Sequence, residues 1–507
     1  MKTDKFKKYL DSACKRRLEC VCVNILADFF LLYFCIVLFA QTLLTFQERI
    51  MKSLKKVIAA GALVLGIAGL FSGCGKKNER VQVRWFVGLG AGSDEPTFAP
   101  QKAVVDKFNK SQNEIELVLE IVDNGQAFQT LATQISGGNA PDIVGPVGIR
   151  GRDSFKGAWL DLEPLVEKSN FDLSQFDASM VDFYRDEQDG LIGLPFGIYP
   201  SYLYVNKELF EEAGIPLPPK NYGEKYIDEN GKEWTWDYDC VRRIAMKLTV
   251  DENGNDATES AFKSGSIVQW GFGIVWGDAR GYGTLFGPGT FVGNDNKAQI
   301  PANWIDAWNW TYDGMWEDCF IPNGPYGTSD ILLNGSWGES GRIAMFQCHL
   351  WYSGYAKMNY QWDVYPMPSY NGKITAKMHA DTFEIPKGSK HPEEAFKVLS
   401  YLVTTASDDL LKIYGGMPAM TAKQDGFLET FFKERYPHVT VNTDIIKESI
   451  KYSDNPNHES WMPSFQEAST CYGEFWDNLI NNKGLSVEKE SEKLKKNLDG
   501  IFSAANK

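Results

Sequence analysis

The segment from residue 81 to residue 147 alternates strand-like and helix-like patterns of apolar residues, and this alternation constrains the fold most. Strand-like runs occupy residues 81–87, 115–121 and 141–146. Apolar residues at helical spacing lie between them, at residues 100–112 and 126–138, where Gly137 and Gly138 end the second pattern. The β-α-β-α-β order predicts an α/β fold with a parallel sheet. Ligands bind such sheets at the carboxyl ends of the strands.

The chain begins with segments that we exclude from the fold. Residues 51–73 have the basic start, short apolar core and small final residues of a signal peptide. Cys74 follows directly, and we expect it to be lipidated and to anchor the protein to the membrane, although a free thiol is the alternative. Residues 74–80 would be a polar tether. We interpret residues 1–50 as a mis-assigned upstream start, because residues 51–73 already form a complete export signal.

The charge balance excludes one class of partner. Residues 1–73 carry 11 of the 52 basic and 5 of the 66 acidic residues, which leaves the remaining 434 residues with a net charge of −20. Nucleic-acid binding needs clusters of Lys and Arg. We therefore expect no nucleic-acid partner.

Motifs for cofactors and metals are broken or missing. After Gly88 and Gly90, the dinucleotide pattern continues with Ser93 instead of glycine. Residues 251–262 have partial EF-hand spacing, but Phe262 replaces the bidentate Glu. The cysteines beyond Cys74 form no zinc motif or readable disulfide framework, and the histidines show no ligand or triad spacing: Cys240, Cys319, Cys348 and Cys471; His349, His379, His391, His438 and His458. We predict no cofactor and no metal.

The most distinctive run is "GLIGLPFGIYPSYLYVNKELFEEAGIPLPP" at residues 190–219. It resembles the extracellular solute-binding proteins of ABC importers, in the branch of the maltose- and multiple-sugar-binding proteins. Further matches follow in the family's order at residues 136–144, 341–354, 365–373, 385–404 and 414–420. Two segments depart from the pattern. Residues 221–234 look like an inserted hairpin with Asn230-Gly231 at its tip, and "MHADTFEI" replaces a glycine pair, so no role is transferred to His379 or Asp381.

The resemblance implies a periplasmic-binding-protein-like fold with two α/β lobes around a ligand cleft, joined by hinge crossovers. One lobe would comprise residues 81–198 and 361–402, and the other residues 203–358 and 408–507. The implied protein is a non-catalytic, extracytoplasmic receptor. It would bind a sugar or oligosaccharide, close around it and deliver it to an ABC permease. We expect it to act as a monomer.

The resemblance and the aromatic residues together give candidate ligand contacts. Trp351 matches a position where sugar-binding relatives often carry a stacking aromatic ring. Tyr199 lies at the first crossover, and Trp85 leaves the first strand at its carboxyl end. Trp276 precedes Asp278 and Arg280, a pair that could bind the hydroxyl groups of a sugar. Each of these aromatic rings could instead belong to the core.

Two other functions remain open from the sequence. A secreted glycan hydrolase would also need an aromatic cleft, and a pair of carboxylates at catalytic distance cannot be seen in a sequence. A related receptor could bind a peptide, polyamine or metal chelate instead of a sugar.

Overall fold

The computed structural model describes residues 80–186 and 189–505. Residues from Arg80 onward form one compact unit. The predicted upstream segment, the signal peptide, and Cys74 with almost all of the tether lie outside the described residues. Within the described part of the chain, no helix is both long and apolar enough to cross a membrane.

The β-α-β-α-β prediction is confirmed. The elements are β1 (Val81–Val87), α2 (Glu95–Ser111), β2 (Ile115–Ile121), α3 (Asn124–Ser136) and β3 (Ile143–Val147). Strand β1 pairs in parallel with both β2 and β3. Helix α2 buries Val104, Val105 and Phe108, the residues at helical spacing.

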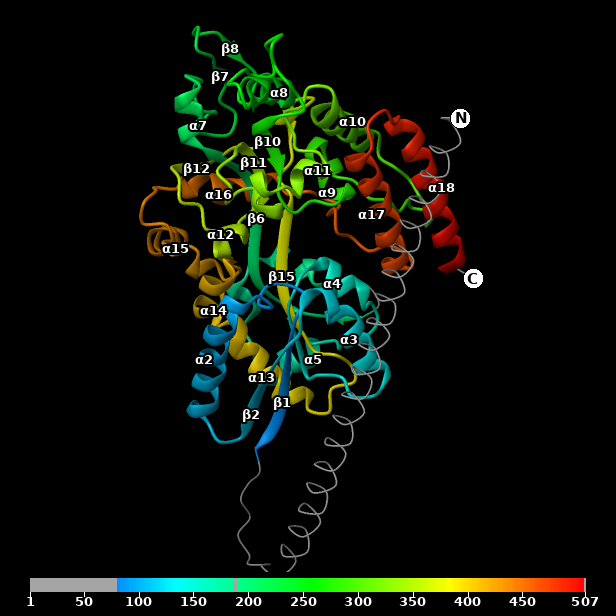
Figure 1. The fold of residues 1–507 in the computed structure, drawn as a ribbon. Coiled ribbons are helices and arrows are strands. Elements are labelled where there is room, and N and C mark those ends of the chain that lie inside the picture. Colours follow the sequence, from blue (N-terminus) through cyan, green and yellow to red (C-terminus); the bar gives the residue numbers. More distant parts are fainter. Residues whose placement is uncertain (1–79, 187–188, 506–507) are drawn as a thin grey trace, which may run out of the picture. The chain divides into compact units, whose positions relative to one another are not determined.

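Two long strands connect this first half of the fold with the second. Strand β6 (Leu194–Asn206) is buried along its whole length. Its first part pairs with β15 (Met378–Glu384) and β16 (Met417–Pro418), and its second part with β11 (Ile343–His349) and β12 (Trp362–Tyr365). The hydrogen-bonded path β2-β1-β3-β15-β6-β11-β10-β9 therefore runs through both halves. Figure 1 shows β6 and β15 side by side at this crossing.

The second half is built around β10 (Ile267–Ile274), which pairs in parallel with β11. Helices α8 (Tyr238–Lys247), α10 (Ala302–Trp316), α17 (Phe465–Asn481) and α18 (Val487–Ala505) surround a second apolar core (Figure 1). Its aromatic content is high, because Trp304 and Trp308 of α10 pack against Phe291 and Phe475.

Shorter elements complete the described chain. The helices and helical turns are α4 (Ile149–Ser154), α5 (Glu163–Ser169), η2 (Leu173–Gln175), α6 (Ala178–Phe183), α7 (Lys207–Glu212), α9 (Ala279–Gly283), η3 (Thr284–Phe286), α11 (Gly324–Gly327), η4 (Asp330–Gly335), α12 (Tyr352–Tyr355), α13 (Pro392–Val403), α14 (Ser407–Tyr414), η5 (Thr421–Lys423), α15 (Phe427–Arg435), α16 (Thr443–Ser449) and η6 (Ile450–Tyr452). The short strands are β4 (Arg185–Asp186), β5 (Gly190–Leu191), β7 (Tyr226–Ile227), β8 (Glu233–Trp234), β9 (Val250–Asp251), β13 (Ser369–Tyr370) and β14 (Lys373–Ile374).

One local interpretation of the sequence, the inserted hairpin, is confirmed. Strands β7 and β8 pair antiparallel, and Gly231 at the tip has a left-handed φ of 77°, so residues 221–234 contain the expected hairpin. The EF-hand-like segment is a loop in which the Asp251 carboxylate accepts hydrogen bonds from the backbone of Asn253, Asn255 and Lys263.

The lobe boundaries stay a prediction. Two contacts connect segments that were predicted for different lobes. Strand β12 pairs with residues 203–206 of β6, and helix α14 packs against α2. The four cysteines in the described chain are free thiols, and three of them are buried.

Candidate ligand-binding site

Two predicted aromatic residues meet at one edge of the sheet. Trp276 follows β10 and Trp351 follows β11. Because β10 and β11 are parallel neighbours, their carboxyl ends lie at the same edge. The two indole rings lie 6.4 Å apart between centroids at an interplanar angle of 69°, and Tyr355 stacks on Trp351 at 6.1 Å and 12°. We call Trp276, Trp351 and Tyr355 the aromatic cluster.

Trp276 is unusual in both exposure and backbone conformation. Its side chain is 69% exposed, and its φ of 59° is left-handed. That conformation is strained for a bulky residue, and such strain is concentrated at functional sites. An exposed indole held in this way is the strongest single indicator of a binding site in the described chain.

Trp351 is half-buried and contacts two histidines. Its indole Nε1 donates a hydrogen bond to Nδ1 of His379 at 3.1 Å. Its ring also lies nearly parallel to the rings of His349 and His379. These contacts orient the indole ring in the ligand-free protein.

Asp278 and Arg280, the two residues expected to bind sugar hydroxyl groups, form an ion pair but differ in exposure. The Arg280 side chain is 2% exposed and lies 3.0 Å from the Asp278 carboxylate, whose own side chain is 35% exposed. Asp278 also caps α9 by accepting from the backbone N–H of Gly281. Burial opposes its ionisation, but Arg280 and this N–H hold the pKa of Asp278 well below its ordinary value. Asp278 is therefore an ionised, partly exposed hydrogen-bond acceptor that is held in place by the buried Arg280.

Trp85 and Tyr199 lie in the core. Trp85 is fully buried, donates from Nε1 to the carbonyl of Gly145 at 2.6 Å and packs against Phe383. Tyr199 is 1% exposed within β6. Neither ring is accessible to a ligand in this structure, so the core alternative describes their positions.

A row of polar side chains on β15 was not predicted as part of the site. Lys377 immediately precedes this strand, and His379 and Asp381 lie within it at alternate positions, so the three share one face of the sheet. Asp381 lies beside Gly148, since a Cβ atom added to Gly148 would be 3.4 Å from its carboxylate. Burial raises the pKa of Asp381 to about 7. Glu459 adds a partly exposed carboxylate whose Oε1 lies 3.8 Å from Nε2 of His379.

Three histidines that lack any spacing pattern in the sequence lie together in the structure. One ring nitrogen from each of His349, His379 and His458 lies within 4.8 Å of the other two. No signal in the sequence identifies this group, because its members come from two strands and a distant loop.

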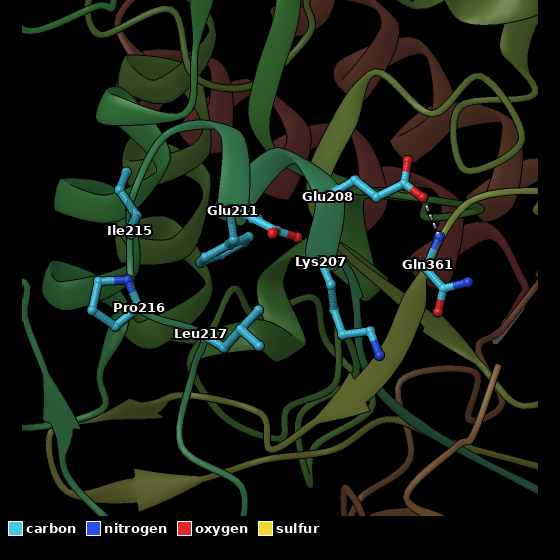
Figure 2. A pocket seen from close by; sticks show the side chains of 8 residues that line it. Lys207, Glu208, Glu211, Ile215, Pro216, Leu217 and Gln361 are labelled. Atoms are coloured by element: carbon cyan, nitrogen blue, oxygen red, sulfur yellow. Dashed lines mark hydrogen bonds between the residues drawn. The ribbon is translucent and has the colours of Figure 1, made fainter.

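A surface cavity of about 500 Å³ lies elsewhere, beside α7 (Figure 2). Charged and aliphatic side chains line it, and Gln361 donates its backbone N–H to Glu208 at its rim. None of the aromatic cluster lines this cavity, so we do not assign the ligand site to it.

Residues 92–409, more than half of the chain, match the family of bacterial extracellular solute-binding proteins. The chain belongs to this family. This binding protein is therefore a solute receptor that acts outside the cytoplasm, as the sequence predicts. Binding proteins of this family are not enzymes.

Solved binding proteins confirm the predicted periplasmic-binding-protein-like fold. One is the ABC substrate-binding protein Lmo0181 from Listeria monocytogenes in complex with cycloalternan, with a TM-score of 0.65, 18% identity, and coverage of 84% of this chain and 99% of that chain. Another is the MalE domain from Bdellovibrio bacteriovorus bound to maltotriose, with a TM-score of 0.61, 16% identity, and coverage of 83% and 99%.

A curated relative matches over a shorter stretch. The sn-glycerol-3-phosphate-binding periplasmic protein UgpB from Yersinia pestis is 31% identical over 137 residues, which cover 25% of this chain. The matched stretch spans 30% of the length of that relative.

Proposed function

We propose that this binding protein is the receptor of a carbohydrate ABC importer. It binds a sugar or oligosaccharide between its two lobes and delivers it to the permease. The fold neighbours bound to cycloalternan and maltotriose support this class of ligand. Binding works by closure, because a ligand that contacts both lobes only in the closed form shifts the population to that form.

The aromatic cluster is the observation that carries the proposal. Pyranose rings present flat CH faces, which stack on indole rings, and hydroxyl edges, which need hydrogen-bond partners. Trp276 and Trp351 provide two ring faces, and Asp278 and Glu459 provide partly exposed acceptors near them. Tyr199, Trp85 and Arg280 are buried, so we assign no direct ligand contact to them.

The charges around the cluster favour a neutral ligand over a phosphate ester. Arg280 and Lys377 are 1% and 2% exposed, and Arg280 is paired with Asp278. A phosphate at the cluster would meet the Asp278 and Glu459 carboxylates first. Like charges in a partly desolvated site repel strongly, and a neutral sugar avoids this cost.

The location of the receptor follows from the sequence. We propose that the mature protein begins at acylated Cys74, remains anchored by this lipid and works as a monomer. Mass spectrometry of the native N-terminus tests the anchor. An unmodified Cys74, or an intact terminus upstream of residue 51, would contradict it.

The ligand proposal is tested on residues 80–507, which form one compact unit. Thermal shift against a panel of sugars, with glycerol 3-phosphate included, identifies the ligand, since a hundredfold excess over Kd stabilises by about 2.7 kcal/mol. Calorimetry then compares Trp276→Ala with Trp234→Ala, a control on the β7–β8 hairpin. We expect weaker binding only for Trp276→Ala. Binding of glycerol 3-phosphate instead of sugars, or turnover of a sugar, would overturn the proposal.

A further inference from the structure

Two of the three clustered histidines reach one another because their strands, β11 and β15, both pair with β6. His349 of β11 lies opposite Ser201 of β6, and His379 of β15 lies opposite Tyr199. Residues 199 and 201 point to the same face of β6, and so do their partners. Ser201 is small, and the imidazole rings of His349 and His379 stack at 3.7 Å between centroids. His458 joins them from the loop before α17.

His349 is the least satisfied member of the group. It is 1% exposed, and neither of its ring nitrogens has a hydrogen-bond partner among the described residues. A buried polar group without a partner destabilises the folded state. Buried imidazoles are normally paired, and a missing ion is one of the standard reasons for an exception.

His458 is oriented toward the cluster by a buried carboxylate. Its Nδ1 lies 2.7 Å from Oδ2 of Asp454. Asp454 also accepts from the backbone N–H groups of Met378 and His458 and is therefore fixed as an acceptor. The proton of His458 consequently sits on Nδ1, and Nε2 presents a lone pair. A carboxylate behind a histidine is the usual outer partner of a metal ligand.

We propose that His349, His379 and His458 form a binding site for a divalent transition metal ion of the zinc class. Nε2 of His379 donates a hydrogen bond to Nε2 of His458 at 3.3 Å, and a metal ion between the two nitrogens would replace this proton. This separation matches the edge of a tetrahedral site with Zn–N bonds of 2.0–2.1 Å, which is roughly 3.3–3.4 Å. Three neutral imidazoles suit zinc and its neighbours. His349 must tilt toward the other two rings to complete the site.

The surroundings allow a cation to enter. The His379 side chain is 22% exposed, which gives a path from the surface. Glu459, 3.8 Å from Nε2 of His379, is placed to serve as a fourth ligand, and Asp454 adds a second negative charge. The cations Lys377 and Arg280 oppose binding, but Arg280 is already paired with Asp278.

Metal binding at His379 is incompatible with the hydrogen bond from Trp351 to His379. An indole N–H can only donate, so Nδ1 of His379 must be an acceptor while Trp351 is bound to it. A metal on Nε2 of neutral His379 moves the proton to Nδ1. The Trp351 indole must then turn away. The metal ion therefore acts on the aromatic cluster, and this inference holds whatever solute the protein transports.

The test uses residues 80–507, stripped of metal with EDTA and titrated with ZnCl₂ by calorimetry. We expect one Zn²⁺ per chain and a change in tryptophan fluorescence. His379→Gln, at the partly exposed ring, should weaken binding more than a hundredfold. Asp454→Asn, which keeps all three imidazoles, should weaken it about 10–100-fold. The double variant His391→Ala/His438→Ala removes the other two histidines and should bind as the wild type does.

A second variant tests the coupling to Trp351. Trp351→Phe removes the competing indole hydrogen bond, which is worth about 1 kcal/mol, and should tighten Zn²⁺ binding roughly fivefold. Absence of stoichiometric binding, or binding lost in the His391/His438 control and kept in His379→Gln, would overturn the site. Unchanged or weaker binding by Trp351→Phe would overturn the coupling.

Discussion

The carboxyl ends of two pairs of parallel strands have opposite characters in the two halves of the molecule. At the ends of β10 and β11, Trp276 is 69% exposed and Trp351 is half-buried beside it. At the ends of β1 and β3 the residues are glycines, and Trp85 is turned fully into the core. A Cβ atom on Gly90 would come within 2.6 Å of the carbonyl oxygen of Pro146, so that loop is packed too closely for a side chain.

The contrast indicates that equivalent strand ends in the two halves of the sheet contribute different groups. The second half exposes the faces of aromatic rings. The first half has closely packed backbone around its glycines and, on β15, the Asp381 carboxyl beside Gly148. The role of a tryptophan near the carboxyl end of a strand therefore cannot be inferred from that position alone. Its role depends on whether the strand end is covered.

Trp85→Ala should have the largest effect and tests the buried side of the contrast. Removing a fully buried indole that packs against Phe383 should lower the free energy of unfolding by about 3–5 kcal/mol. Urea unfolding measures this, with Trp276→Ala as the control that should change by no more than about 0.5 kcal/mol. Equal stabilities for the two variants would break the comparison.

Asp381→Asn tests the carboxyl beside the glycine loops through its pH dependence. Burial raises the pKa of Asp381 to about 7, so the folded state holds this proton more tightly than the unfolded state. The ionised carboxylate therefore costs stability as pH rises from about 4 to about 7, by up to roughly 1.4 kcal/mol per pH unit. Asn mimics the protonated form. The variant should match the wild type near pH 4 and exceed its stability near pH 8; a constant difference across this range would refute the raised pKa.

Trp351→Ala tests the aromatic side. Once the solute is identified, its Kd should rise about thirtyfold, or about 2 kcal/mol, because a stacking face is lost. Isothermal calorimetry measures this loss. The free protein should lose less stability than it does with Trp85→Ala. A greater loss of stability with unchanged affinity would assign Trp351 to the core.

The smallest expected effect concerns the backbone at Trp276. Its φ of 59° costs a side chain with Cβ about 1 kcal/mol but is free for glycine. Trp276→Gly should therefore be more stable than Trp276→Ala by about this amount in urea unfolding. A less stable glycine variant would mean that the left-handed turn is not a source of strain.

The fold was largely predictable from the sequence, because periodicity reports which residues are covered. The helical spacing of Val104, Val105 and Phe108 and the alternation in residues 115–121 identified the first half, and ordered motifs identified the family. The run "VQVRWFV" could not show that Trp85 is buried in the core. A parallel strand is covered on both faces, so its apolar and polar residues do not alternate.

The site was less predictable, because its members meet only through strand pairing. Trp351 was found through its match to the family, and Trp276 through the polar pair, Asp278 and Arg280, that follows it. His349, His379 and His458 could not be found, since their proximity depends on the register of β11 and β15 against β6. Register and burial are properties of the assembled sheet.

Strand β6 also determines the order in which the chain can fold during synthesis. Its first part needs β15, which begins at Met378, before the sheet that contains β1 to β3 is closed. Contacts so distant in sequence form late, because the intervening loop must be closed first. When synthesis has reached residue 200, the first half still lacks β15 and helix α13. The first half therefore cannot complete its sheet until β15 has been synthesised, and this delay favours an unfolded chain, the form in which a protein can pass a narrow channel.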